Sequence, residues 1–257
     1  FSLHWLRLWA LCAFRLWDLV VDLRNAPVTY LIPTRRRRGM SREGGDARRV
    51  ERLARVLNLE NIPAPCLWTT DEDERLATQF ISDGPPVLAV GPTANWRAKT
   101  WRAENFSQLI ERLTGPDGIL PGARVALFGR DDERPMALGL IQALPPERCI
   151  DLVGKLDLLT VHACLGRCAF YVGNDSGLMH LAAASGIPTL GLFGPTQESL
   201  YAPWGEHTGI VRTRIPFGEI FPEDFDHRTS DSLMGSLSVE MAEQGARDLW
   251  RRCQVEG

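Results

Sequence analysis

One segment in the second half of the chain constrains the fold more than any other. It opens with a short apolar run, Ala169 to Val172, which predicts a buried strand. After a turn, the alanine-rich stretch Leu178 to Ser185 is compatible with a helix. Gly186 and Pro188 end that helix, and a second apolar run, Thr189 to Phe193, predicts the next strand. The order strand, turn, helix, strand predicts a βαβ unit in a parallel sheet.

The turn inside this unit has the composition of an anion site. Asp175 and Ser176 are good helix N-caps, and Gly177 allows the backbone to approach a ligand closely. His180 falls in the first turn of the helix, on the same side. A helix N-terminus offers free N–H groups and the positive end of the helix dipole. The turn therefore predicts a phosphate-binding site.

Composition limits the partners of the chain. The 257 residues are 44% hydrophobic and carry a net charge of −3, which leaves no general basic field for nucleic acid. The six cysteines have no framework spacing, so we expect reduced thiols in the cytoplasm and neither a disulfide framework nor a metal site. No stretch has the pattern of a signal peptide or a membrane-spanning helix.

The composition changes at Ser82 to Pro86, where we expect a domain boundary. Residues 1–83 are predicted to be a partial N-terminal domain. Residues 84–237 are predicted to form a C-terminal domain that contains the anion site. A last helix, residues 238–257, could pack back on the N-terminal domain.

From Val87 onward, at least five strands alternate with helices, which predicts an α/β fold with a doubly wound parallel sheet. The loop after the first of these strands contains Thr93, Asn95 and Lys99. Ligands of open α/β sheets bind at the carboxyl ends of the strands, where a lysine supplies a mobile charge for phosphate. A merely solvated lysine is the alternative interpretation.

Two further loops follow strands at the same predicted edge. The first holds Asp131, Asp132 and Glu133, any of which could accept hydrogen bonds from ribose hydroxyls. Helix capping by Asp131 is the alternative there. The second loop holds Thr196, which could reach a phosphate or a sugar hydroxyl. Both loops lie at the same predicted edge as the anion site.

A run of four arginines, Arg35 to Arg38, precedes a loop rich in glycine and charge. We expect a solvated loop here. The functional alternative is an electrostatic contact with an anionic acceptor or with anionic lipid headgroups.

Several motifs occur in the order found in one enzyme family. They are Lys99-Thr100-Trp101, Leu152-Val153-Gly154-Lys155, Gly173-Asn174-Asp175-Ser176-Gly177 with His180-Leu181-Ala182, and Phe193-Gly194-Pro195-Thr196. With them the chain resembles glycosyltransferase family 9, the bacterial ADP-heptose:lipopolysaccharide heptosyltransferases. The resemblance implies a GT-B-like architecture: a C-terminal Rossmann-like domain that holds the donor, and here an incomplete N-terminal Rossmann-like domain.

The resemblance also implies the chemistry. It implies an inverting, metal-independent transfer of heptose from ADP-heptose to the lipopolysaccharide inner core, with no cofactor, at the inner face of the inner membrane. Glu133 or Asp132 would contact the ribose, and Leu152 to Gly154 would lie near the adenine. The residues that would bind the donor are Thr93, Asn95, Lys99, Glu133, Asp175, Ser176, Gly177, His180 and Thr196.

One departure from the family pattern concerns catalysis. The family's catalytic base is an aspartate in a glycine-rich loop of the N-terminal domain, and no segment here matches it; Asp22, near a strand end, does not fit the motif. We therefore expect a fragment that binds the donor with little or no transfer. The alternatives are a non-catalytic nucleotide-sugar-binding module, and an enzyme of the same scaffold that uses UDP- or GDP-linked donors.

Overall fold

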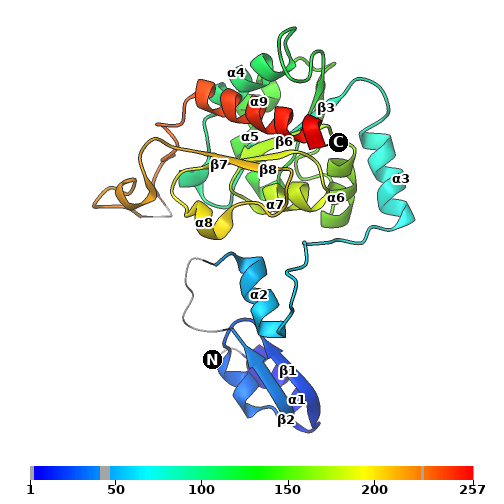
Figure 1. Cartoon of the computed structure of the whole chain (residues 1–257), viewed down its shortest axis with the longest axis vertical. Coiled ribbons are helices and arrows are strands. Elements are labelled where there is room, and N and C mark those ends of the chain that lie inside the picture. Colours follow the sequence, from blue (N-terminus) through cyan, green and yellow to red (C-terminus); the bar gives the residue numbers. More distant parts are fainter. Residues whose placement is uncertain (1–2, 41–46, 227–228, 257) are drawn as a thin grey trace. The chain divides into compact units, whose positions relative to one another are not determined.

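The structure is a computed structural model that describes residues 3–40, 47–226 and 229–256 (Figure 1). The chain packs as two compact units, residues 1–63 and residues 64–257. The predicted domain boundary after residue 83 stays a prediction, because packing units need not coincide with functional domains. The helix α3 (Asp71–Phe80) belongs to the second unit, where its Ala77 is fully buried and contributes to an apolar core.

The second unit is built on one sheet of six parallel strands in the order β5-β4-β3-β6-β7-β8. The direction of chain progress reverses between β3 and β6, which pair in register with Gly91 opposite Gly173. This is the doubly wound topology that the alternation of strands and helices predicts. The strands are β3 (Val87–Gly91), β4 (Arg124–Leu127), β5 (Cys149–Asp151), β6 (Phe170–Asn174), β7 (Thr189–Phe193) and β8 (Thr208–Arg212).

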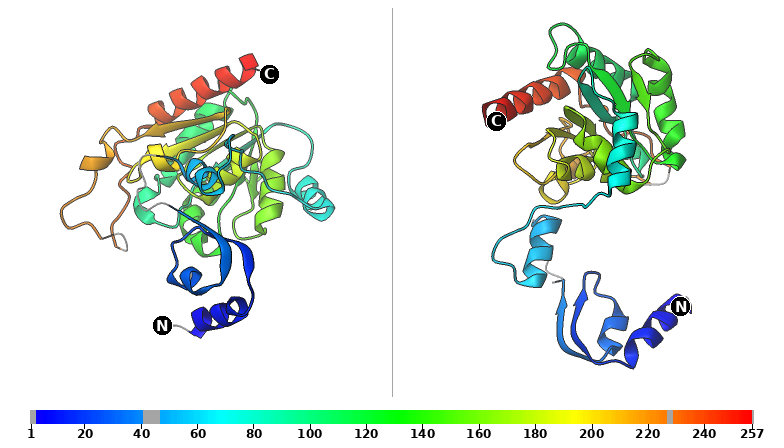
Figure 2. Two further views of the ribbon diagram at one scale, coloured as in Figure 1. Left: turned by 60° about the horizontal axis from the view of Figure 1, so that its bottom comes forward. Right: turned by 90° about the vertical axis from the view of Figure 1, so that its right-hand side faces the viewer.

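Helices cover both faces of this sheet (Figures 1 and 2). Successive strand residues point to opposite faces, so Leu88 and Val90 join one apolar core and Ala89 joins the other. The first core packs under α4 (Ala103–Thr114), α5 (Arg134–Ala143) and α9 (Val239–Glu256), and the second under α3, α6 (Leu158–Gly166) and α7 (Gly177–Ala184).

The C-terminal helix α9 uses its apolar stripe within the second unit. Its residues Val239, Ala242, Ala246 and Leu249 are buried in the core shared with α4. Arg112 of α4 adds an ion pair to Glu243 of α9 at 3.1 Å. A contact of this helix with the N-terminal domain stays a prediction.

The first unit holds two parallel strands, β1 (Trp17–Asp22) and β2 (Thr34–Gly39), with α1 (Leu3–Ala13) and α2 (Arg49–Leu57). The expectation of a loop at Arg35 to Arg38 is wrong, because these residues form most of β2. Parallel pairing with β1 satisfies the backbone groups on one edge of β2, and the long side chains reach solvent or local partners. Arg35 pairs with Asp18 at 2.9 Å, and Arg37 lies over the Tyr30 ring.

Three shorter elements lie outside the predicted pattern. The strand β8 joins the sheet beside β7, although its partly exposed residues give only a weak apolar signal. The short helix α8 (Glu198–Tyr201) follows β7, and a 3₁₀ turn covers Pro27–Leu31 in the first unit. The spacing of Val50, Leu53, Ala54 and Leu57 predicts an amphipathic helix from Asp46 to Asn58. The structure shows this helix as α2; Asp46 itself lies outside the described residues. Within the described residues, every helix is too short or too polar to cross a membrane.

Candidate functional site

The candidate site lies at the carboxyl ends of β3 and β6, where the following connections diverge to opposite faces of the sheet. Such a switch point is the usual ligand site of open α/β sheets. Asn174, at the end of β6, ties the two sides together. Its side chain accepts a hydrogen bond from the Trp101 N–H at 3.0 Å and donates one to the Pro92 carbonyl at 2.8 Å. The loop of residues 92–101 is therefore fixed over the end of β6.

This loop places the Lys99 side chain next to Asp175. Lys99 Nζ lies 2.9 Å from Asp175 Oδ2, and the two side chains are only 17% and 5% exposed. Solvent screens a pair with this degree of burial much less than a surface pair. Asp175 is not a helix cap, contrary to the expectation: Ser176 occupies the N-cap position of α7, without a side-chain cap bond. The carboxylate of Asp175 positions Lys99 instead.

A cavity of about 820 Å³ opens beside the pair. Three of the predicted donor-binding residues line it: Asn95, Lys99 and Thr196. Sequence reasoning missed five others, of which three share the loop of Lys99 and could have been found by their position in it. The full lining is Ala94, Asn95, Trp96, Arg97, Lys99, Met136, Thr196 and Tyr201.

One buried hydroxyl that lines the cavity lacks an internal partner. Thr196 Oγ1 is buried and forms no hydrogen bond with any residue that the structure describes. Thr196 is only 8% exposed and yet lines the cavity. Because buried polar groups are almost always satisfied, a ligand in the cavity is the natural partner for Thr196.

Glu133 and Thr93 form a second, buried pair. Thr93 Oγ1 donates to Glu133 Oε2 at 2.7 Å, and the Arg130 N–H donates to the same oxygen at 3.2 Å. Neither residue lines the cavity of about 820 Å³. Asp132 forms an exposed ion pair with Arg130 at 2.7 Å. A ribose contact by Glu133 or Asp132 stays a prediction.

Gly177 and His180 lie on the first turn of α7. A Cβ atom at Gly177 would meet nothing within 4 Å, so the space above this backbone is open to a ligand. The pKa of His180 lies below its usual value, because the atoms packed around the ring exclude water and disfavour the charged imidazolium. More than a third of the residue still reaches solvent. Asp175 opposes this shift and Lys99 adds to it. His180 is therefore neutral near pH 7 and can donate or accept one hydrogen bond.

The floor of the site is the ring of Tyr171. A Cβ atom on Gly91 would lie 2.1 Å from the Tyr171 hydroxyl oxygen, and one on Gly173 would lie 2.4 Å from it. Tyr171 is fully buried below both strand ends. The two glycines therefore make room for this ring at the switch point.

The connection after β5 is held against the start of α5. Arg134 donates to the Val153 carbonyl at 2.9 Å and pairs with Asp151 at 2.6 Å. Burial would raise the pKa of Asp151, but Arg134, the Val153 N–H and Lys155 outweigh it and hold the pKa below its usual value. Gly154 adopts a positive φ of 73°, and a Cβ there would meet Asp131 at 2.7 Å. The predicted adenine region, Leu152 to Gly154, is thus a well-defined loop.

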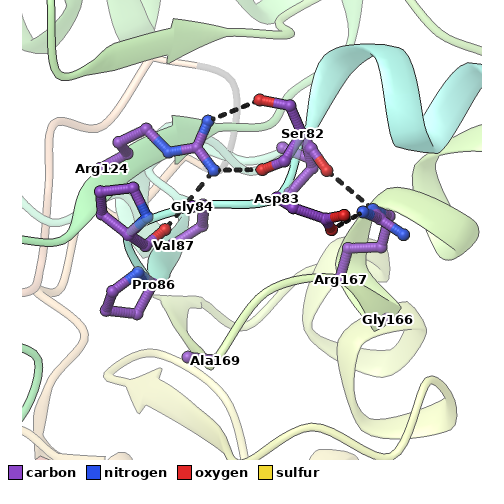
Figure 3. Close-up of a pocket in the computed structure, with 11 residues that line it drawn as sticks. Ser82, Asp83, Gly84, Pro86, Val87, Arg124, Gly166, Arg167 and Ala169 are labelled. Carbon is purple, nitrogen blue, oxygen red and sulfur yellow. Dashed lines mark hydrogen bonds and ion pairs between the residues drawn. The ribbon is translucent and has the colours of Figure 1, made fainter.

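A second cavity, of about 460 Å³, lies at the opposite edge of the sheet, where the strands begin (Figure 3). The guanidinium groups of its two arginines already have protein partners. Arg124 donates to the carbonyls of Ser82 and Pro85, and Arg167 pairs with Asp83 at 2.7 Å. These contacts fix the segment before β3. Among the described residues, no cluster of three or more His, Cys, Asp or Glu could hold a metal ion.

Comparison with known proteins agrees with this geometry. The profile of glycosyltransferase family 9 (heptosyltransferase) matches residues 46–219, more than half of the chain. The chain belongs to glycosyltransferase family 9. Among curated relatives, lipopolysaccharide heptosyltransferase 2 of Escherichia coli K12 is 30% identical over 195 residues, which are 72% of this chain and 55% of the relative. Lipooligosaccharide heptosyltransferase 2 of Haemophilus influenzae is 36% identical over 131 residues, 49% of this chain and 36% of the relative.

Solved structures of family 9 members share the fold. The family 9 glycosyl transferase of Veillonella parvula superposes with a TM-score of 0.73 at 17% identity, covering 96% of this chain and 76% of its own. The ADP-heptose lipopolysaccharide heptosyltransferase II of E. coli gives a TM-score of 0.67 at 23% identity, covering 93% and 78%. The predicted family and the GT-B-like α/β fold are confirmed. The chain spans about a third to a half of the length of the curated relatives that it matches.

Proposed function

We propose that this chain binds ADP-heptose at the switch point of its parallel sheet and serves heptose transfer to the lipopolysaccharide inner core. One observation carries the proposal: the partly buried Lys99–Asp175 pair stands beside the N-terminus of α7, and its Lys99 lines a cavity of ligand size. The curated relatives are heptosyltransferases, and one solved E. coli heptosyltransferase is described with ADP. Both facts support an adenine nucleotide-sugar as the donor.

The proposed chemistry needs a stabilised leaving group. When the bond between the sugar and the diphosphate breaks, negative charge develops on ADP. Lys99 has three N–H donors, of which Asp175 takes one, and the others can face the diphosphate. The free N–H groups of α7 add a fixed positive potential at the same place. Because these groups already supply positive charge to the leaving diphosphate, the transfer would not require a metal ion. Direct attack of the acceptor hydroxyl on the face of the sugar opposite the diphosphate would make it inverting.

Activation of the acceptor hydroxyl would need a base. The resemblance assigns this role to an aspartate in a glycine-rich loop, and none of the residues that line the cavity is a carboxylic acid. We propose that this chain alone binds the donor and transfers heptose slowly or not at all. Heptose transfer by the purified chain at the rate of a full-length family member would contradict this part of the proposal.

Calorimetry with ADP, UDP and GDP tests the donor site. We expect ADP to bind, and Lys99→Met to weaken its binding by about tenfold or more, since one charge-assisted hydrogen bond contributes roughly 1.5–3 kcal/mol. The matched control is Arg75→Ala, which removes an exposed cation of α3 whose partner is Glu72. Equal affinity for all three nucleotides, or an unchanged affinity in Lys99→Met, would refute the proposed site.

We further propose that the first unit contacts an anionic surface, such as phosphorylated lipid headgroups. Residues 1–63 contain twelve arginines against six acidic residues, whereas the whole chain has a net charge of −3. Arg36 is exposed on β2 and suits a test. Arg36→Glu should reduce cosedimentation with phosphatidylserine vesicles, and vesicles of phosphatidylcholine should bind neither protein. Equal binding of the variant and the wild type would exclude this contact.

A further inference from the structure

Two aromatic side chains of the cavity face the same cation. The centre of the Trp96 ring lies 5.9 Å from Lys99 Nζ, and the centre of the Tyr201 ring lies 6.0 Å from it. Trp96 comes from the connection after β3, and Tyr201 is the last residue of α8, after β7. Both rings line the cavity, although the chain brings them from positions more than a hundred residues apart. We call Trp96 and Tyr201 the aromatic walls.

Both walls are supported from behind. Phe225 packs its ring against Trp96 at 5.5 Å between centroids, with an edge-to-face angle of 67°. On the other side, Glu198 at the start of α8 pairs with Arg212 at the end of β8. Arg212 also donates to the Gly194 carbonyl at 3.3 Å, which fixes the turn between β7 and α8. Tyr201 is 51% exposed, yet the short helix that carries it is anchored at its first residue.

The strand order determines on which side of Lys99 the nucleoside and the sugar of a bound donor would lie. The connections of β4 and β5, which hold the predicted ribose and adenine contacts, lie on one side of the switch point. The connection of β7, which holds Thr196 and Tyr201, lies on the other side. Lys99, the proposed diphosphate contact, stands between them. A nucleotide-sugar with its phosphates at Lys99 and its nucleoside toward β4 must place its sugar toward β7.

We propose that the aromatic walls bind the six-membered sugar ring of the donor. Because of this contact the site binds a nucleotide-sugar more tightly than the free nucleotide. This inference rests on the proposed function and adds the sugar subsite to it. The apolar C–H face of a pyranose packs well on an aromatic ring, and the unpartnered hydroxyl of Thr196 in the same lining suits a sugar hydroxyl. Lys99 links the phosphate subsite to this sugar subsite.

The test compares ADP-heptose with ADP by calorimetry on the full chain. Trp96→Ala and Tyr201→Ala should each weaken ADP-heptose binding about three- to tenfold, the effect of losing one aromatic contact, and leave ADP binding unchanged. Trp96→Phe and Tyr201→Phe keep a ring and should restore most of the affinity. Trp68→Ala is the matched control, because Trp68 is 82% exposed and does not line the cavity.

The outcomes separate this inference from the proposed function. If the wild type binds neither ADP nor ADP-heptose, the proposed function fails and the sugar subsite with it. If the wild type binds both and the alanine variants weaken both equally, the rings hold Lys99 or the nucleoside, and the sugar subsite alone is refuted. Unchanged affinities in both alanine variants refute it as well.

Discussion

The Trp101 N–H donates a hydrogen bond to the side-chain oxygen of Asn174 across the crevice between β3 and β6, at 3.0 Å. The amide group of Asn174 donates in turn to the Pro92 carbonyl. The loop that carries Lys99 is thus closed at both ends by one side chain that is completely buried. The position of the cation in the site depends on a residue that itself does not line the cavity.

Asn174→Ala should therefore destabilise the second unit and weaken nucleotide binding together. It leaves a buried N–H and a buried carbonyl without partners, which costs about 1–3 kcal/mol for each group. Urea denaturation measures the loss, and calorimetry measures the affinity for ADP. Gln108→Ala removes an exposed amide from α4 and should change neither. A variant that keeps wild-type stability would show that Asn174 does not hold the loop.

Lys99 and Asp175 should show strong energetic coupling. Lys99→Met leaves a buried carboxylate unpaired, and Asp175→Asn leaves the ammonium with a neutral partner, so each single change should reduce the free energy of unfolding. The double variant should lose less free energy of unfolding than the two single variants together, and the difference is a coupling energy of about 0.5–3 kcal/mol. Denaturant unfolding of the four proteins gives this value. Additive effects would mean that the contact contributes nothing to stability.

Glu133→Gln should identify the ribose contact. The Gln side chain keeps the acceptor for Thr93 and Arg130 but loses the charge, so the affinity for ADP should fall by about tenfold and that for 2′,3′-dideoxy-ADP should not change. Asp132→Asn is the matched comparison at the neighbouring acid. If only Asp132→Asn lowered the affinity for ADP, the ribose contact would be made by Asp132 and not by Glu133.

Asp151 should make the second unit sensitive to acid. Its pKa is held below the usual value of 3.8, so the folded state favours the ionised form. The resulting stability is complete above that value and is lost as the pH falls through the lower pKa of the folded state. Asp151→Asn should cost about 1–3 kcal/mol at neutral pH, and its difference from the wild type should shrink below about pH 4.

Urea midpoints across this pH range measure the effect. Asp248→Asn, which removes a carboxylate from the exposed side of α9, is the control and should cost at most about 1 kcal/mol. A difference between Asp151→Asn and the wild type that stays constant down to pH 3 would contradict the role given to Asp151.

Most of the second unit was predictable because its elements repeat a simple signal. Val87 to Gly91 and Phe170 to Asn174 are short apolar runs that end in polar loops, and buried parallel strands have this pattern. The strand β8 lacks it, because an edge strand needs only one apolar face. The prediction of a loop at Arg35 to Arg38 was wrong for a related reason. Backbone pairing can hold a strand even when its side chains are polar.

The site was predictable only in part. Lys99, Asn95 and Thr196 follow strands directly, so the topology alone brings them to one edge. Asp175 follows a strand as well, but its partner Lys99 could not be read from local capping preferences. Tyr201 and Met136 reach the cavity from helices, where a long side chain can point to a core or to a ligand with the same sequence pattern.

The ring of Tyr171 below Gly91 and Gly173 makes these three positions one evolutionary unit. A side chain can enter at either glycine only after the tyrosine has become smaller, because the ring and a new Cβ would occupy the same space. Substitutions here must therefore occur in a fixed order, and a lineage that keeps the tyrosine cannot explore other residues at the two strand ends. The floor of the site should therefore change first at Tyr171 or remain as it is.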